Sequence, residues 1–258
     1  MNETLQQIDR RVSLRAYADR PIEEEHVGAI LDSAIRAPTA GNMMLYSILR
    51  VGDSSKRKKL AQTCGHNFIA EAPLVLVFLA DMQRWVDYFE GSGVRQRCER
   101  EGQEYLTPDA AKLLMSCCDA LIAAQNTVIA AESLGIGSCY VGDIMGRAEE
   151  NRALFDLPPF TFPIVLLCYG YSPEGFERRR SDRFDRRFIV HDNVYHRATH
   201  EDLDEMLGGI RQKFASVLEK RAMNLGQLTY GGFMAGPTAI EQRESVELLL
   251  EPWLDDQP

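Results

Sequence analysis

Segments with a helical spacing of apolar residues alternate along the chain with short runs that are apolar throughout. Residues 21–35 open with a proline and three glutamates and then place apolar side chains at helical spacing, which predicts a helix. The charged segment 53–63 predicts a second helix. Residues 46–51 and 73–80 are short apolar runs, and such runs are typical of strands covered on both faces of a sheet.

A long helix and two more strands follow. Residues 108–134 carry small or apolar side chains on nearly every side, which predicts a helix buried almost all round. Gly135 is placed to cap its C-terminus. Strands are predicted over residues 136–141 and 162–169. Helices that alternate with four strands indicate an α/β or α+β layered domain.

The last third of the chain has a different composition. Residues 178–187 are dense in charge, residues 200–221 predict an amphipathic helix, and residues 222–258 show no clear core of their own. We therefore expect a core over residues 1–197. Residues 198–258 are expected to form a long C-terminal helical arm that packs on the core or on a partner subunit.

Composition narrows the class of protein. A chain of 258 residues with 45% apolar and 26% charged residues is long enough to enclose one large core. Its net charge of -9 disfavours nucleic-acid binding, which needs a basic surface. We expect no apolar run of the roughly 20 residues that span a bilayer, and no signal peptide, so the prediction is a cytoplasmic protein without a membrane partner. The six cysteines lack CxxC spacing, which indicates reduced core residues and no metal site.

The clearest candidate for chemistry lies near the N-terminus, where Arg11, Ser13 and Arg15 recur at every second residue. In an extended segment this period places all three side chains on one side. Two guanidinium groups and a hydroxyl on one side match a phosphate group. A solvated, arginine-rich surface turn explains this segment about equally well by itself. The small, polar loop 37–42 favours a binding site, because such a backbone can approach a planar ligand closely.

Four blocks of sequence carry the remaining signal. In chain order they are RVSLRAY at 11–17 with APTAGN at 37–42, DALIAAQN through CYVG at 119–142, LPPFTFPIVLLCYGYSP at 157–173, and RF at 183–184 with VHDNVY at 190–195. Together, over roughly residues 8–197, they resemble the FMN-dependent nitroreductase family, and most nearly its oxygen-insensitive nitroreductases and NADPH-flavin oxidoreductases. The resemblance implies a nitroreductase-like fold with a central mixed sheet of four to five strands flanked by helices.

The resemblance also implies a set of cofactor-binding residues for FMN. At the phosphate and ribityl chain they are Arg11, Val12, Ser13, Arg15 and Arg183; along the ring edge Pro38, Thr39, Asn42 and Met44; near the reactive nitrogen Tyr140, Val141, Gly142 and Asp143; and at the ring or ribityl chain His66 and Asn67. His66, as a lone loop histidine, is equally compatible with a surface role. The chain departs from the family at Val12, where a second arginine is common, at Met44, where many members have glutamine, and at Ser181, where a second cation is expected.

The implied function is electron transfer from NAD(P)H to nitroaromatic, quinone or flavin acceptors by a ping-pong mechanism. No catalytic side chain is expected, because the flavin carries the chemistry. Two alternatives stay open: another flavin enzyme of the superfamily, dimethylbenzimidazole synthase-like or dehalogenase-like, or a non-catalytic flavin-binding sensor. We also expect a homodimer, with the 108–134 helix in its interface and the flavin sites at the subunit boundary.

Overall fold

The computed structural model describes residues 1–254. By contacts between its residues, the chain divides into two compact units. The first comprises residues 1–179 together with the segment that begins at residue 241, and the second comprises residues 180–240. The assignment of residues 198–258 to a separate arm stays a prediction.

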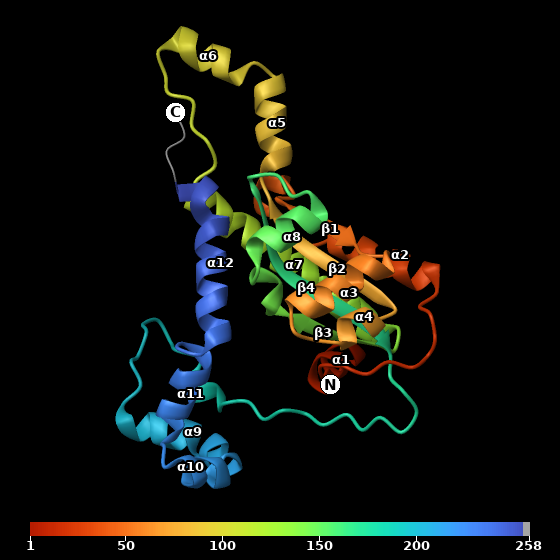
Figure 1. Ribbon diagram of the computed structural model, residues 1–258, viewed down its shortest axis with the longest axis vertical. Coiled ribbons are helices and arrows are strands. Elements are labelled where there is room, and N and C mark those ends of the chain that lie inside the picture. Colours follow the sequence, from red (N-terminus) through yellow and green to blue (C-terminus); the bar gives the residue numbers. More distant parts are fainter. Residues whose placement is uncertain (255–258) are drawn as a thin grey trace. The chain divides into compact units, whose positions relative to one another are not determined.

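The first unit is built on one four-stranded sheet (Figure 1). Its strands are β1 (Tyr46–Arg50), β2 (Leu74–Asp81), β3 (Ile136–Val141) and β4 (Thr161–Tyr171), in the order β1-β2-β4-β3. All eight residues of β2 are buried, as its apolar sequence predicts for a covered strand. The four predicted strands are confirmed to within two residues at each end.

Every pairing between named strands is antiparallel. The expected mixed sheet therefore needs a correction. Its parallel component in the described residues is a single bridge between Ser13 and Ser138. The connections explain the antiparallel pairing, because β2 follows β1 and β4 follows β3 in the chain, and each returns in the opposite direction beside its predecessor. The N-terminal segment that runs parallel to β3 is too short to form a strand.

Helices cover both faces of the sheet, which confirms the layered α+β architecture. On one face, α2 (Glu24–Ile35) and α7 (Ala110–Ser133) enclose a core that includes Ile30, Phe78 and Tyr169. On the other face, α3 (Ser54–Thr63), α4 (Phe68–Glu71) and α8 (Ala148–Phe155) enclose a core that includes Leu60, Val77 and Leu166. The predicted cap is also present, since Gly135 follows α7 with a φ of 74°.

Further helices complete the first unit. They are α1 (Glu3–Arg10), α5 (Gln83–Gly91) and α6 (Val94–Glu101), joined by the final part of α12 (Pro237–Leu254). Leu249 and Trp253 of α12 are buried in a third core cluster with Leu45 and Phe162. The end of the C-terminal segment therefore packs on the core of its own chain.

One prediction about α7 is wrong for the single chain. The helix buries one side, while Leu114, Met115, Leu121 and Ile122 are between 40% and 68% exposed. By length and composition α7 is also apolar enough to span a membrane, whereas no such run is expected from the sequence. In the protein, 44% of the most apolar window of this helix is buried. Packing of one face on the sheet is typical of a core helix.

The second unit consists largely of helices. They are α9 (His200–Lys213), α10 (Ala215–Arg221) and α11 (Leu225–Phe233). The predicted helix over 200–221 is thus two helices, with a break at Phe214. Thr199 and Asp202 form a reciprocal capping box at the start of α9. An ion pair of 2.5 Å between Lys213 and Asp182 ties α9 to the preceding loop.

Candidate functional site

The N-terminal segment lies along β3, the strand at the edge of the sheet. Leu14 N–H donates to the carbonyl of Ser138 at 2.9 Å, next to the parallel bridge at Ser13. Gly137 permits this close approach, because a Cβ at that position would lie 2.7 Å from the Leu14 side chain. Gly170 does the same for Tyr17, whose ring would lie 2.5 Å from an added Cβ. Two glycines therefore let the segment lie flat on the strands.

Arg11, Ser13 and Arg15 all approach the thiol of Cys139 on β3. Burial raises the pKa of this thiol, and Arg15, Ser13 and Arg11 oppose that rise through their charges or hydrogen bonds. All three side chains therefore lie near this thiol. The structure thus brings together the two guanidinium groups and the hydroxyl that the period of two predicts. Val12, between them, is half-buried.

Arg11, Ser13 and Arg15 form a positively charged cluster, which we call the arginine cluster. No ion pair to Arg11 or Arg15 occurs in the part of the chain that the structure describes. Arg11 Nη1 and Ser138 Oγ are both buried without a hydrogen-bond partner. Arg11 also lines a cavity of about 50 Å³ with Glu132, whose Oε1 lacks a partner as well. Guanidinium groups match the oxygens of an anion, so Arg11 and Arg15, which form no ion pair within the described residues, give the cluster the donors that an anion needs.

The loop over residues 38–44 forms a second group. Gly41, Asn42 and Met44 have left-handed backbones, with φ of 56°, 59° and 50°. Pro38 and Asn42 are exposed, and Met44 is half-buried against the sheet core. The Thr39 hydroxyl points inward, where it donates to the carboxylate of Asp119 and accepts from Met44 N–H at 2.8 Å.

A third group lies where β3 ends and the short helix η2 (Gly142–Met145) begins. His66 Nε2 and Asp143 Oδ2 are 3.2 Å apart, and both side chains are about two-fifths exposed, at 42% and 41%. The His66 ring stacks on Phe68 with 5.2 Å between centroids. Asn67 is exposed and Val141 is buried, so Val141 can offer a ligand its backbone only.

Tyr140 is half-buried next to these residues. Its hydroxyl donates to Gln125 Oε1 at 3.1 Å. Burial raises the pKa of Tyr140 to about 12, and Arg11 partly opposes the rise. The phenol therefore stays protonated near neutral pH and is a hydrogen-bond donor there.

The structure joins the predicted residues only in part. β3 connects the arginine cluster at its start with Asp143 and His66 beyond its end. Among the described residues, no hydrogen bond or ion pair links the 38–44 loop to either of these groups. Arg183 belongs to the second unit, where its guanidinium donates to the carbonyls of Ser181 and Asp182, and its place in the site stays a prediction.

The family is decided by comparison with known proteins. The model of the Nitroreductase family matches residues 8–171, more than half of the chain. The chain belongs to the nitroreductase family. This confirms the resemblance drawn from the four sequence blocks.

Relatives of this nitroreductase-family protein cover most of its length. It is 28% identical to the FMN reductase (NADPH) of Bacillus subtilis, over 76% of this chain and 75% of that protein. It is also 28% identical to the NADPH-flavin oxidoreductase of Vibrio harveyi, over 95% of each chain. Among solved structures, nitroreductase A from Vibrio parahaemolyticus is similar with a TM-score of 0.81 and 25% identity, over the full length of both chains. The predicted fold is therefore confirmed.

Sequence reasoning about this nitroreductase-family protein missed the role of Asp119. In the sequence Asp119 stands out only as the first residue of the DALIAAQN block. In the structure it is 3% exposed and accepts hydrogen bonds from the Ala40 and Leu45 amides at 3.1 and 3.2 Å, in addition to the Thr39 hydroxyl. An acidic residue on the buried face of an apolar helix was the signal that could have identified it.

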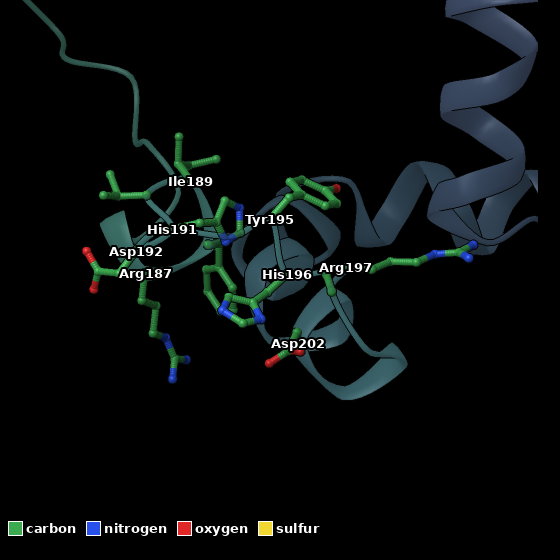
Figure 2. Close-up of a pocket in the computed structure, with 11 residues that line it drawn as sticks. Arg187, Ile189, His191, Asp192, Tyr195, His196, Arg197 and Asp202 are labelled. Atoms are coloured by element: carbon green, nitrogen blue, oxygen red, sulfur yellow. The ribbon is translucent and has the colours of Figure 1, made fainter.

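One large cavity lies apart from the predicted site. It has a volume of about 710 Å³ and lies in the second unit, along the fourth sequence block (Figure 2). His191 lies beside Tyr195 and His196 there, with ring centroids 5.0 and 6.0 Å apart. None of the predicted cofactor-binding residues lines this cavity, whose walls come from residues 187–202.

Proposed function

We propose that this chain binds FMN and transfers electrons from NAD(P)H to small electron-poor acceptors such as nitroaromatics, quinones or free flavins. The observation that carries the proposal is the convergence of Arg11, Ser13 and Arg15 on β3 without a carboxylate partner. Family membership and the names of the two relatives, an NADPH-dependent FMN reductase and an NADPH-flavin oxidoreductase, agree with it. They do not favour flavin cleavage, dehalogenation or a sensor without turnover.

The phosphate end fits the residues that are present. FMN differs from riboflavin by its phosphate, which Arg11, Ser13 and Arg15 would hold with their guanidinium groups and hydroxyl. The guanidinium groups hold this anion at any working pH, because arginine stays protonated. Arg183 stays a proposed phosphate-binding residue on the family resemblance alone. Val12 in place of a second arginine leaves the cluster with fewer donors than many members have.

The residues at the ring end of the site would position the flavin ring and enclose it. The bound flavin supplies the hydride chemistry, and the protein supplies orientation and electrostatics. By the family resemblance, Pro38, Thr39, Asn42 and Met44 would hold the edge of the ring. The backbone of Tyr140 to Asp143, at the end of β3, would hold the ring near its reactive nitrogen, and His66 and Asn67 would hold the ring or the ribityl chain.

A homodimer is part of this proposal. The exposed side of α7 presents Leu114, Met115, Leu121 and Ile122, a stripe that a second copy of the chain would cover. In this proposal the flavin sites lie at the subunit boundary. An obligate interface of this kind exceeds roughly 2,000 Å². We place the enzyme in the cytoplasm, where its six free cysteines stay reduced.

The first experiment is to measure flavin content. The purified protein should contain tightly but noncovalently bound FMN, or take up one FMN per chain when FMN is added. Acid precipitation should release the flavin intact into the supernatant. A colourless protein that does not bind added FMN would contradict the proposal.

A further inference from the structure

Asp119 is an unusual residue for its position. It lies on the buried face of α7, whose other buried residues there are mostly small or aliphatic, and is 3% exposed. Burying a polar group without partners costs several kcal/mol, so such a residue persists where its hydrogen bonds are made. Both carboxylate oxygens of Asp119 have partners, and all of these partners belong to one loop, residues 39–45.

That loop has a backbone that its own sequence does not impose. Asn42 and Met44 are left-handed residues other than glycine, and each such conformation costs roughly 1–2 kcal/mol. Asparagine tolerates this region, whereas methionine has no local hydrogen bond to favour it. A conformation of this kind persists only when its surroundings fix it.

The surroundings fix the loop from two sides. Inside, Asp119 accepts from the Thr39 hydroxyl and from the amides of Ala40 and Leu45, and the same Thr39 oxygen accepts from Met44 N–H. Outside, Trp85 Nε1–H donates to the Met43 carbonyl at 3.0 Å. The carboxylate thus binds both ends of the loop, and Thr39 carries the constraint to Met44.

We propose that Asp119 is a positioning residue for the ring end of the site: its carboxylate holds the 38–44 loop in the conformation that presents Pro38, Asn42 and Met44 to the flavin ring. This inference rests on the proposed function. It also gives Thr39 a different task from the one that the resemblance implies. Its hydroxyl is occupied by Asp119 and Met44, so Thr39 fixes the loop rather than donating to the ring.

Three variants and one control separate this role from general stability. Asp119→Asn keeps the size of the side chain but always turns an NH₂ group toward the amide of Ala40 or Leu45, which are donors themselves. Thr39→Val removes the hydroxyl, and Thr39→Ser keeps it. The control is Ser116→Ala, because Ser116 is buried on the same helix and its hydroxyl donates to the Lys112 carbonyl of its own helix instead of to the loop.

The first measurement is amide hydrogen exchange of the loop in protein freed of flavin. Asp119→Asn should accelerate exchange at Ala40 and Leu45 at least tenfold, since hydrogen bonds to charged groups contribute about 1.5–3 kcal/mol. Thr39→Val should accelerate exchange at Met44, while Thr39→Ser and Ser116→Ala should leave the loop at wild-type rates. Wild-type rates in both Asp119→Asn and Thr39→Val would overturn the proposal.

The second measurement uses the flavin-loaded variants. The ratio of FMN to riboflavin affinity should stay at its wild-type value, because the phosphate cluster does not contact Asp119. The circular dichroism of the bound flavin should change, and the KM for a quinone acceptor should rise about tenfold in Asp119→Asn and Thr39→Val but not in Thr39→Ser. If the wild type binds no FMN, the proposed function fails. If the wild type binds FMN and these variants keep its dichroism and KM, only the role of Asp119 fails.

Discussion

Replacement of Arg15 by alanine tests the phosphate cluster most selectively. Arg15 is preferable to Arg11, because Arg11 also faces Glu132 in a small cavity and its loss would leave that carboxylate altered too. Arg15 is exposed and without a carboxylate partner, so its removal leaves no buried charge behind. The variant should therefore fold like the wild type.

The size of the effect follows from one charge-assisted contact. Such a contact contributes about 1.5–3 kcal/mol, and exposure of Arg15 to water favours the lower end of that range. At about 1.4 kcal/mol per tenfold change, FMN should bind roughly tenfold more weakly to Arg15→Ala. Riboflavin lacks the phosphate, so its affinity should change by less than about twofold.

The assay is a titration of flavin-free protein that follows the quenching of flavin fluorescence, with FMN and with riboflavin. Arg10→Ala is the matched control: it removes a neighbouring guanidinium group, which donates to the Glu132 carbonyl at 3.5 Å and has no part in the cluster. The FMN affinity of wild type should also weaken with added salt more than that of Arg15→Ala. Equal losses of FMN and riboflavin affinity in Arg15→Ala would refute the reasoning.

Three further predictions concern stability, kinetics and assembly. Hydrogen bonds from the Tyr171 hydroxyl and Arg20 lower the pKa of Glu23 to about 2, whereas the pKa of a glutamate in the unfolded chain is about 4.3. The ionised Glu23 therefore stabilises the folded protein fully above about pH 4.3, and this stabilisation is lost as the pH falls toward 2. Urea unfolding between pH 2 and 5 should show a shallower pH dependence in Glu23→Gln, and an unchanged slope would contradict the assignment. Steady-state kinetics should give parallel double-reciprocal lines, because one face above the flavin serves NAD(P)H and the acceptor in turn; intersecting lines would indicate a ternary complex instead. Light scattering should give a dimeric mass that Leu121→Glu reduces, and a fully active wild-type monomer would remove the shared-site proposal.

Local patterns in the sequence were sufficient where burial alone decides the structure. The run over residues 73–80 is apolar at every position because helices cover both faces of the sheet, and the pattern predicted β2 directly. Strand direction is different, because it depends on how the connections return, and so the sheet is antiparallel where a mixed one was expected. The apolar side chains around α7 predicted that the helix is buried on most sides. The sequence pattern alone does not distinguish burial against the sheet of the same chain from burial against another chain.

In the candidate site, too, local patterns in the sequence predicted the local geometry but not the contacts between distant segments. The period of two at Arg11, Ser13 and Arg15 was enough to place three side chains on one side, because an extended segment has that geometry by itself. The bonds between Asp119 and the loop at Thr39 span 80 residues of sequence, and no local pattern encodes them. The pairing of His66 with Asp143 is of the same kind.

An anaerobic titration of the FMN-loaded protein tests the central claim most directly. Addition of NADPH or NADH should bleach the visible absorption of the bound flavin at one equivalent of nicotinamide per flavin. A subsequent equivalent of quinone should restore the absorption fully. A bound flavin that neither nicotinamide reduces, or a reduced flavin that neither a quinone nor a nitroaromatic reoxidises, would contradict the assignment of this chain as an NAD(P)H-dependent oxidoreductase.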